Sequence, residues 1–357
     1  MDLLKDTLNK ITEPDNKAKI HAKEKWDSLL KPMGSLGALE EITIKIAGMT
    51  GKVINRLNKK AIVVMCSDNG VVDEGVSSAP QIFTKVLAQS MTKGITGVAT
   101  LGKYTDTDII TIDMGIICEV NDKKIISKKI GNGTRNFVKG PAMTYESAVK
   151  SIETGIEIGD RLYKEGYDIL GTGEVGIGNT TTAAAVISAI SGLDVDLTCG
   201  KGAGLTDEQH TDKKNVIRKA IELNKPDRDD PIDVLSKVGG FDIGGMCGLF
   251  LSAAKNKRPI VIDGFISSAA ALCALRLNPL VSEYMIPSHL SAEPGAKYVL
   301  DELKLNPILN LNMRLGEGSG CPLAFQIIDA AIFTQENMGT FDDVSLSSSS
   351  LVDIREE

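Results

Sequence analysis

The chain has 357 residues, of which 42% are hydrophobic, 24% are charged and only 4% are aromatic, and its formal net charge is −7. This length suits one large α/β domain with a smaller unit beside it. The acidic balance and the scarcity of aromatic side chains disfavour the basic stripes and stacking surfaces of nucleic-acid binding, so we expect a protein that binds small molecules.

Cysteine, histidine and apolar patterns narrow the class further. The six cysteines occur singly, and none belongs to a CxxC pair, which is typical of reduced thiols in a cytoplasmic protein. His21, His210 and His289 lie far apart and show no metal-ligand spacing. The N-terminus lacks the apolar core of a signal peptide, and no apolar run reaches membrane-spanning length. We therefore expect a cytoplasmic protein without a metal, a membrane partner or a nucleic-acid partner.

The first 50 residues are predicted to be helical. Apolar residues recur at helical spacing over residues 2–31, which predicts one helix there. The stretch KPMGSLGALEEITIKIAGMTG then reads as a Pro/Gly turn that leads into a second amphipathic helix. Ser35 or Gly37 is the expected cap of this helix.

Four short apolar runs follow, and each ends in an acidic residue. KAIVVMCSDNG ends at Asp68, DIITIDMG at Asp113, YDILGTGEVG at Glu174 and RPIVIDGF at Asp263. Each run is followed by a segment of helical composition. Apolar strands that alternate with helices predict an α/β fold with a parallel sheet covered by helices on both faces. Ligands bind such sheets at the carboxyl ends of the strands, where these acidic residues fall.

The stretch GTGEVGIGNTTTAAAV (Gly171–Val186) allows several interpretations. Its first six residues match G-x-G-x-x-G after a strand, with Asp194 and Asp196 about 20 residues later, as in an NAD-dependent oxidoreductase. In that fingerprint, however, the third glycine lies inside the helix, whereas Gly178 and Asn179 follow it here and are poor helix-interior residues. A P-loop is excluded because no Gly-Lys-Ser/Thr is present. We predict a longer glycine loop before a helix capped by Asn179 or Thr180.

Such a loop suits an anion. Backbone N–H groups of a glycine turn and of a helix start converge on one point, and threonine hydroxyls add donors. A second glycine cluster, CGKGAGL, offers further amides, and Lys213 follows it as a cation for the same ligand. We expect a single phosphate; the alternative is a tight turn that packs closely and binds nothing.

Glu317 stands between two glycines in MRLGEGSGC. The glycines allow a sharp turn and let a ligand approach the carboxylate, so Glu317 is a candidate general base with a pKa raised by burial. The alternative is a solvated loop acid. For His289 we expect only a structural hydrogen bond near a helix start.

Eight motifs in one order carry a resemblance to a known family: KPMGSLGALE, EGVSSAPQ, GTGEVGIGNTTTAAAV, GKGAGL, GGFDIGGMCG, VIDGFISSAAAL, SHLSAEPG and MRLGEGSGC. From about Lys31 to about Thr340 the chain resembles the nicotinate-nucleotide–dimethylbenzimidazole phosphoribosyltransferases, which prepare the lower ligand of cobamides. The resemblance implies a large Rossmann-like domain (31–329) and a small helical domain made from both chain ends (1–30 and 330–357). It also implies a homodimer without cofactor or metal.

The resemblance implies a reaction and a set of site residues. Nicotinate mononucleotide gives its phosphoribosyl group to an aromatic base, nicotinate leaves and an α-ribotide forms. Glu317 corresponds to the catalytic base. The expected nucleotide-binding residues are Glu174, Gly176, Ile177, Gly178, Asn179, Thr180, Thr181, Gly202, Ala203, Lys213 and Asp263, and the expected acceptor-binding residues are Ser78, Pro80, Phe83, Val86, Leu87, Val175 and Leu315.

Two positions depart from the family pattern. Asn69 stands where relatives commonly have histidine, and Val86 stands where they usually have a glutamine on the acceptor wall. A less polar wall favours a phenol or cresol as the alternative to 5,6-dimethylbenzimidazole. Some phenol-activating relatives work as pairs of unequal homologous subunits, so a heterodimer and a non-catalytic nucleotide-binding subunit are further alternatives. Glu317 argues against the latter, because a purely binding subunit needs no base.

Overall fold

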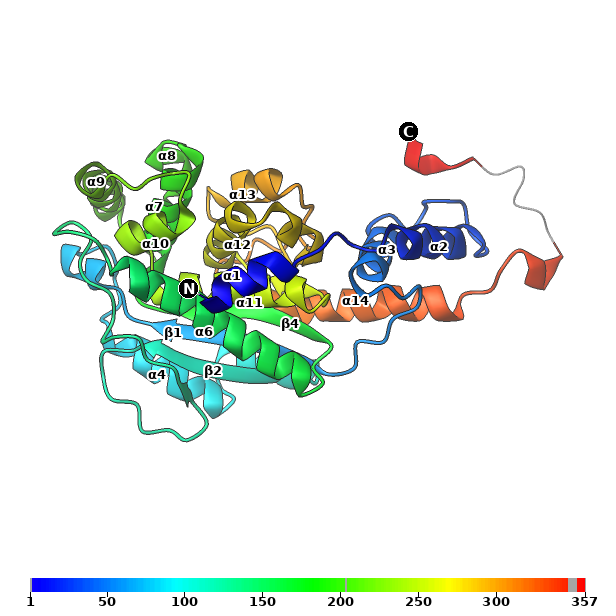
Figure 1. Cartoon of the computed structure of the whole chain (residues 1–357), viewed down its shortest axis with the longest axis horizontal. Coiled ribbons are helices and arrows are strands. Elements are labelled where there is room, and N and C mark those ends of the chain that lie inside the picture. The colour runs from blue at the N-terminus through cyan, green and yellow to red at the C-terminus, as the bar shows by residue number, and fades with distance from the viewer. Residues whose placement is uncertain (1, 203, 346–351, 357) are drawn as a thin grey trace.

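A computed structural model describes residues 2–202, 204–345 and 352–356. One sheet of parallel strands forms its centre, in the spatial order β3-β2-β1-β4-β5-β6 (Figure 1). This is the strand order of the Rossmann fold. The point at which the order of successive strands reverses lies between β1 and β4, which are themselves parallel. The strands are β1 (Lys60–Ser67), β2 (Asp108–Gly115), β3 (Ile126–Ser127), β4 (Ile169–Val175), β5 (Ile260–Ile262) and β6 (Met285–Pro287).

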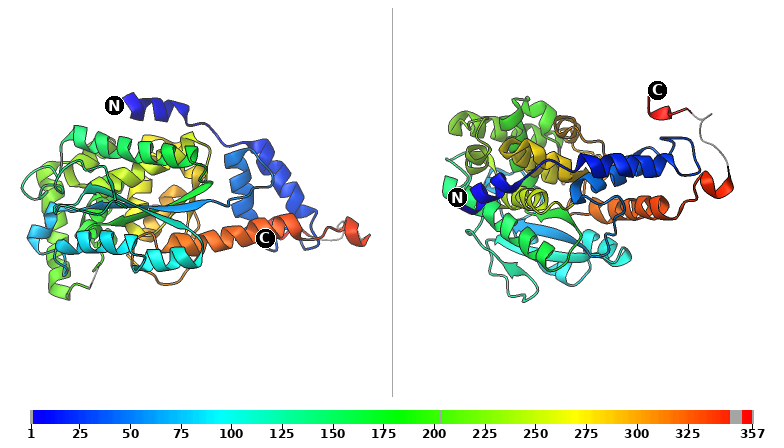
Figure 2. Two further views of the ribbon diagram at one scale, coloured as in Figure 1. Left: turned by 90° about the horizontal axis from the view of Figure 1, so that it is seen from below. Right: turned by 45° about the vertical axis from the view of Figure 1, so that its right-hand side comes forward.

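Helices cover both faces of this sheet, which confirms the predicted fold class (Figures 1 and 2). One face carries α6 (Tyr145–Lys164), α11 (Phe241–Lys255) and α12 (Phe265–Leu277), and the other carries α4 (Ile82–Thr92), α5 (Gly97–Tyr104) and α14 (Gly320–Asn337). Because β1 and β4 are covered on both sides, nearly every one of their residues is buried. The other helices of the large body are α7 (Asn179–Ser191), α8 (Val195–Thr198), α9 (Asp207–Asn224), α10 (Pro231–Val238) and α13 (Ala296–Leu303).

The strand register brings the predicted acidic residues together. Cys66 of β1 pairs with Asp113 of β2, and the neighbouring Met65 pairs with Glu174 of β4. Asp68 and Asp263 follow β1 and β5 directly. The four expected strands are therefore confirmed, together with the convergence of their acidic ends. The three-residue β6 was not predicted.

The prediction of one helix over residues 2–31 is wrong. The segment forms α1 (Asp2–Lys10) and α2 (Asn16–Asp27), because Pro14 disfavours helical backbone at the residue before it. Asp15 then caps α2 by accepting a hydrogen bond from the amide of Ala18 at 3.0 Å. As a result α1 packs on α6 and α11, while α2 packs elsewhere. The next helix, α3 (Ala38–Thr50), has Gly37 as its N-cap, as expected.

Helices from near both ends of the chain, α2, α3 and α14, form a small helical group beside the sheet, whereas α1 lies away from it (Figure 2). α2 packs on α3, and α3 packs on α14. The single tryptophan, Trp26, is fully buried there and donates to the Thr43 hydroxyl at 2.6 Å. The predicted boundary at residue 31 assigns α3 to the large domain; α3 packs on α2 and α14 and also contacts the turn Pro279–Tyr284 of the large body. The two-domain division stays a prediction.

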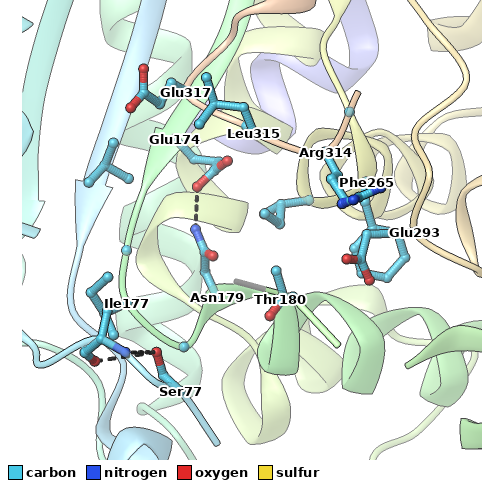
Figure 3. Close-up of a pocket in the computed structure, with 18 of the residues that line it drawn as sticks. Ser77, Glu174, Ile177, Asn179, Thr180, Phe265, Glu293, Arg314, Leu315 and Glu317 are labelled. Atoms are coloured by element: carbon cyan, nitrogen blue, oxygen red, sulfur yellow. Dashed lines mark hydrogen bonds between the residues drawn. The ribbon is translucent and has the colours of Figure 1, made fainter. Parts of the chain in front are cut away.

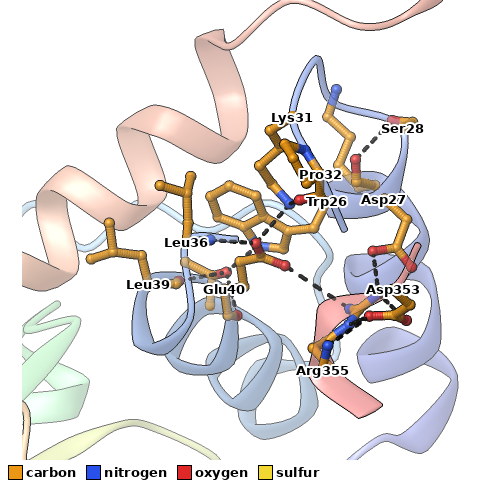
Figure 4. Close-up of polar contacts among 12 residues, drawn as sticks. Trp26, Asp27, Ser28, Lys31, Pro32, Leu36, Leu39, Glu40, Asp353 and Arg355 are labelled. Atoms are coloured by element: carbon orange, nitrogen blue, oxygen red, sulfur yellow. Dashed lines mark hydrogen bonds and ion pairs between the residues drawn. The ribbon is translucent and has the colours of Figure 1, made fainter. Parts of the chain in front are cut away.

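A buried ion pair closes this helical group (Figure 4). The Lys31 ammonium lies 2.6 Å from the Glu40 carboxylate, and the two side chains are 5% and 2% exposed. Glu40 also accepts from the amide of Leu36 at 3.0 Å, and the Arg355 guanidinium lies 3.9 Å from its other oxygen. Lys31 packs over the ring of Trp26. The KPMGSLGALE motif is thus a loop whose two ends are joined by opposite charges.

We predict that Lys31→Met lowers the free energy of unfolding by about 3–5 kcal/mol, because it leaves the Glu40 charge buried without its main partner. Replacing both residues, as in Lys31→Met with Glu40→Met, should restore most of the loss. Urea unfolding followed by circular dichroism and by Trp26 fluorescence measures both. Lys10→Met removes a solvent-exposed pair with Asp6 and should cost less than about 1 kcal/mol. Equal losses for the two single variants would contradict the prediction.

Candidate active site

A cavity of about 310 Å³ lies at the carboxyl ends of the strands, where the strand order reverses (Figure 3). Its walls come from loops that follow β1, β4, β5 and β6, and from the loop that precedes α14. These loops converge because parallel strands end at the same edge of a sheet. The lining residues are 76–79, 174–180, 263–267 and 314–317, together with Phe83, Leu87, Gly202, Leu205, His289, Ser291 and Glu293.

The glycine-rich stretch begins as strand and continues as helix, with only a short turn between them, so the prediction of a long glycine loop is wrong. Gly171 and Gly173 lie inside β4. A Cβ atom on Gly173 would come within 2.4 Å of the carbonyl oxygen of Glu317, so this glycine lets the 316–320 loop pack directly on the strand. The turn is limited to residues 176–178, and α7 begins at Asn179 after Gly178, whose φ is 88°. The dinucleotide fingerprint is not formed, because its first two glycines lie in the strand instead of the turn.

Glu317 is held in the wall of the cavity and is only 8% exposed, so the solvated alternative is wrong. Its backbone has a φ of 64°, an uncommon value for a non-glycine residue. One carboxylate oxygen accepts a hydrogen bond from the amide of Val98, at the start of α5, at 3.1 Å. Burial raises the pKa of Glu317, although this hydrogen bond opposes the shift. Such a carboxyl group has the properties of a general base.

Two further buried carboxyl groups share one amide. The side-chain NH₂ of Asn179 donates to Glu174 and lies 3.3 Å from an oxygen of Asp242. Burial raises the pKa of Glu174 well above its ordinary value, and the charges of Asp242 and Asp263 add to the shift. Burial likewise raises the pKa of Asp242 to about 6. Desolvation and mutual repulsion therefore favour the protonated form of Glu174.

Asp263 holds the Glu317 loop in place. Its two oxygens accept hydrogen bonds from the amides of Gly318, at 3.1 Å, and Gly320, at 2.7 Å. The side chain is 3% exposed, and burial raises its pKa to about 7. The carboxyl group of Asp263 thus connects the end of β5 to the start of α14.

The other end of the cavity is rich in hydrogen-bond donors. The Lys213 ammonium is buried and donates to the Thr180 hydroxyl at 2.8 Å and to the carbonyl of Gly200 at 3.2 Å. Gly202 has a φ of 57°, and a Cβ atom there would lie 2.9 Å from the same hydroxyl. Burial lowers the pKa of Lys213. An anion bound beside Thr180 would favour the charged ammonium.

Most of the predicted site residues line this cavity, but not all of them. Those that do are Ser78, Phe83, Leu87, Glu174, Val175, Gly176, Ile177, Gly178, Asn179, Thr180, Gly202, Asp263, Leu315 and Glu317. Thr181 is enclosed in α7, and Lys213 reaches the cavity through Thr180. Pro80 and Val86 are exposed outside the lining, Val86 to 48%. Ala203 lies outside the described residues. The functional roles of all these residues stay predictions.

Comparison with known proteins decides the family. A family model described as Phosphoribosyltransferase matches residues 11–346. The chain is 54% identical to the nicotinate-nucleotide–dimethylbenzimidazole phosphoribosyltransferase of Clostridium tetani, with 100% of this chain and 99% of the relative covered. It is 48% identical to that of Clostridium acetobutylicum, with 96% and 97% covered. The crystal structure of CobT from Thermus thermophilus matches with a TM-score of 0.88 at 34% identity, covering 93% of this chain and 99% of that one.

The chain belongs to the nicotinate-nucleotide–dimethylbenzimidazole phosphoribosyltransferase family. Membership confirms the expected enzyme class, a pentosyltransferase, and disfavours the oxidoreductase alternative. Within the described residues, no cluster of three or more His, Cys, Asp or Glu side chains is placed to hold a metal ion. The same part of the chain contains no helix that is long and apolar enough to cross a membrane.

Several residues that line the cavity of this chain were not predicted from its sequence. Phe265, Glu293 and Arg314 line it, and so does His289, for which only a structural hydrogen bond was expected. His289 has that bond, at 3.0 Å from the hydroxyl of Ser288, and burial lowers its pKa. The motifs SHLSAEPG and MRLGEGSGC contain three of these four residues. The signal was therefore present, but it did not indicate which side chains face the ligand.

We predict that the stability difference between the wild type and Asp263→Asn depends on pH. Burial raises the folded-state pKa of Asp263 from 3.8 to about 7, so its ionisation opposes folding. Relative to the variant, the wild type should therefore lose stability between about pH 4 and 7, by up to about 4 kcal/mol, and change little above that range. Chemical denaturation of both proteins across this range measures the difference. A constant difference would contradict the prediction.

Proposed function

We propose that the protein transfers the phosphoribosyl group of nicotinate mononucleotide to an aromatic base, releasing nicotinate and forming an α-ribotide for cobamide nucleotide-loop assembly. The names of the Clostridium relatives support the two substrates. The observation that carries the proposal is the division of one cavity into two ends. Thr180 and Gly202 lie at an end suited to a phosphate, and Glu317 lies in a wall suited to the acceptor.

The phosphate end supports nucleotide binding. Gly178, Asn179 and Thr180 at the start of α7 line the cavity, where the helix dipole favours an anion, and the Lys213 ammonium donates to the Thr180 hydroxyl. A phosphate fixed there would hold the ribose in one orientation. The positioning would allow the acceptor to reach the anomeric carbon from the face opposite to the leaving nicotinate.

The proposed reaction forms one bond and breaks another. A nitrogen of the acceptor donates an electron pair to the anomeric carbon, while the electrons of the bond to nicotinate return to the pyridine nitrogen. The N–H proton on the other ring nitrogen of the acceptor passes to Glu317. Loss of this proton makes the attacking nitrogen a better nucleophile. Positive charge on the ribosyl carbon in the transition state is stabilised by the nearby carboxylates. Attack on the opposite face inverts the anomeric configuration and gives the α-ribotide.

The acceptor wall is largely apolar, which supports a flat aromatic ring. Phe83 and Leu87 reach the cavity from α4, one helical turn apart, and Val175 and Leu315 also line it. We propose 5,6-dimethylbenzimidazole as the acceptor, as in the names of the relatives, and a phenol or cresol as the alternative. With a phenol, Glu317 would remove a hydroxyl proton. Val86 lies outside the lining and supports neither acceptor.

Exposed apolar side chains support association with a homologous chain. Ile82, Phe83 and Val86 of α4 are 47%, 46% and 48% exposed, and Leu315 at the cavity is 60% exposed. Apolar groups gathered beside a cavity are typical of a surface that a partner or a ligand covers. We propose a homodimer; the alternative is a pair of unequal homologous subunits.

The purified single chain tests the proposed function directly. We expect it to form an α-ribotide from nicotinate mononucleotide and 5,6-dimethylbenzimidazole, detected by chromatography and mass spectrometry, with cresols tested in parallel. Transfer by the chain alone would exclude a non-catalytic subunit. Binding of mononucleotide without transfer to any acceptor would favour that alternative. Tight NADH binding without mononucleotide binding would favour the oxidoreductase.

We predict that Glu317→Gln lowers kcat by about 10²-fold or more, because a neutral amide cannot take the acceptor proton. The substitution keeps the shape of the side chain and an oxygen that can accept from the amide of Val98. Steady-state kinetics with both substrates varied measures the change. Glu302→Gln, on the exposed side of α13, is the matched control and should leave kcat unchanged. If Glu317→Gln turns over like this control, Glu317 is not the base.

A further inference from the structure

Arg314 lines the cavity and is exposed to solvent. Its guanidinium makes no hydrogen bond or ion pair with any residue that the structure describes. Elsewhere on the chain, arginines such as Arg56, Arg218 and Arg276 are engaged by carboxylates. A free guanidinium in the wall of a ligand cavity needs an explanation beyond surface charge.

Backbone pairing positions Arg314. The chain after β6 continues beside residues 309–313: the amide of Leu290 donates to Leu309 at 2.9 Å, and the amide of Ala292 donates to Met313 at 3.0 Å. These bonds end immediately before Arg314 and bring it to the cavity. In Figure 3, Arg314 lies with Phe265 and Glu293 on the side away from the Glu317 carboxylate. The arginine is thus separated from the proposed base.

The charges of the other lining residues make this cation unusual. Glu174, Asp263, Glu293 and Glu317 all line the cavity as carboxyl groups. Arg314 forms no ion pair within 4.0 Å with any of them, and one oxygen of Glu293 faces Gly200 instead. Lys213, the other nearby cation, is already bonded to Thr180 at the phosphate end. One cation is therefore left to serve a second anionic group of the ligand.

Nicotinate mononucleotide carries two such groups, a phosphate and a ring carboxylate. Resting on the proposed function, we propose that Arg314 binds the carboxylate of the nicotinate ring and makes the enzyme select nicotinate mononucleotide over nicotinamide mononucleotide. The planar guanidinium can donate two parallel hydrogen bonds to a carboxylate. The amide of nicotinamide offers only one acceptor oxygen, and its NH₂ group would face the N–H groups of the arginine. The discrimination would arise from these unmatched donors.

The test compares both mononucleotides in the wild type, in Arg314→Gln and in Arg314→Lys, with 5,6-dimethylbenzimidazole at a fixed saturating concentration. For Arg314→Gln we expect kcat/KM for nicotinate mononucleotide to fall about 10- to 100-fold, mainly through KM, because a charge-assisted contact is lost. The value for nicotinamide mononucleotide should change less than about threefold. Arg314→Lys should recover part of the preference, since it restores the charge without the planar fork.

Arg56→Gln is the matched control. Arg56 precedes β1 and therefore lies at the amino ends of the strands, opposite to the cavity. It pairs with Glu336 there. Its replacement should leave the ratio of the two kcat/KM values unchanged.

The outcomes separate the two proposals. No ribotide from either mononucleotide with the wild type would defeat the proposed function. An active wild type whose preference is unchanged in Arg314→Gln would overturn the role of Arg314 alone. An equal loss for both mononucleotides would also overturn it, since Arg314 would then hold the phosphate or the loop instead of reading the ring substituent.

Discussion

The site depends on the two hydrogen bonds by which Asp263 holds the loop that carries Glu317. The carboxyl group is buried at the end of β5 and accepts from the amides of Gly318 and Gly320 at 3.1 and 2.7 Å. Buried amides that lose their acceptors destabilise a fold by a few kcal/mol, so the loop has no comparable alternative position. The same bonds place the first turn of α14. One side chain therefore joins the central sheet, the wall of the cavity and a helix that reaches the small helical group.

Close packing of the Glu317 backbone on β4 also positions this loop. Gly173 has no side chain, so Glu317 can lie directly over β4, where a Cβ atom would come within 2.4 Å of its carbonyl oxygen. The left-handed backbone of Glu317 is strained. It is kept in place by the bonds from the following amides, of Gly318 and Gly320, to Asp263 and by the bond from the Val98 amide to the Glu317 carboxylate. The proposed base is thus positioned by rigid elements on both sides, which suits a reaction that depends on orientation.

More of the fold than of the candidate site could be predicted from the sequence. Short apolar runs that end in an acidic residue identified β1, β2, β4 and β5, and these acidic ends indicated the edge that carries the cavity. The three residues of β6 were too short for any periodicity, and the break at Pro14 interrupts an apolar pattern that continues in register across it.

The glycine-rich stretch shows why a motif can mislead. Gly171 and Gly173 resemble a phosphate loop in sequence, yet their lack of side chains serves contacts with Cys321 and Glu317, which lie about 150 residues away. Glu317 itself could be predicted because its flanking glycines are a local signal. Arg314 and Glu293 could not, since nothing local says which way a side chain points. The Lys31–Glu40 pair was invisible for the same reason: only the fold brings these charges out of water.

The distribution of charge in the cavity explains how one chain could hold a dianionic nucleotide beside several carboxyl groups. Burial raises the pKa values of Glu174 and Asp263, which favours their protonated forms and makes the repulsion lower than a count of acids suggests, whereas the proposed reaction uses Glu317 as the carboxylate. The proposed donors for the phosphate, Thr180 and Lys213, are bonded to each other and not to these carboxyl groups. In the proposed reaction the ribosyl carbon becomes positive between the two ends. Carboxylates fixed in a poorly hydrated wall stabilise that charge more than they stabilise the neutral sugar, and this difference lowers the barrier. In the proposed reaction this distribution of donors and carboxyl groups would orient the nucleotide and would also favour the transition state over the bound substrate.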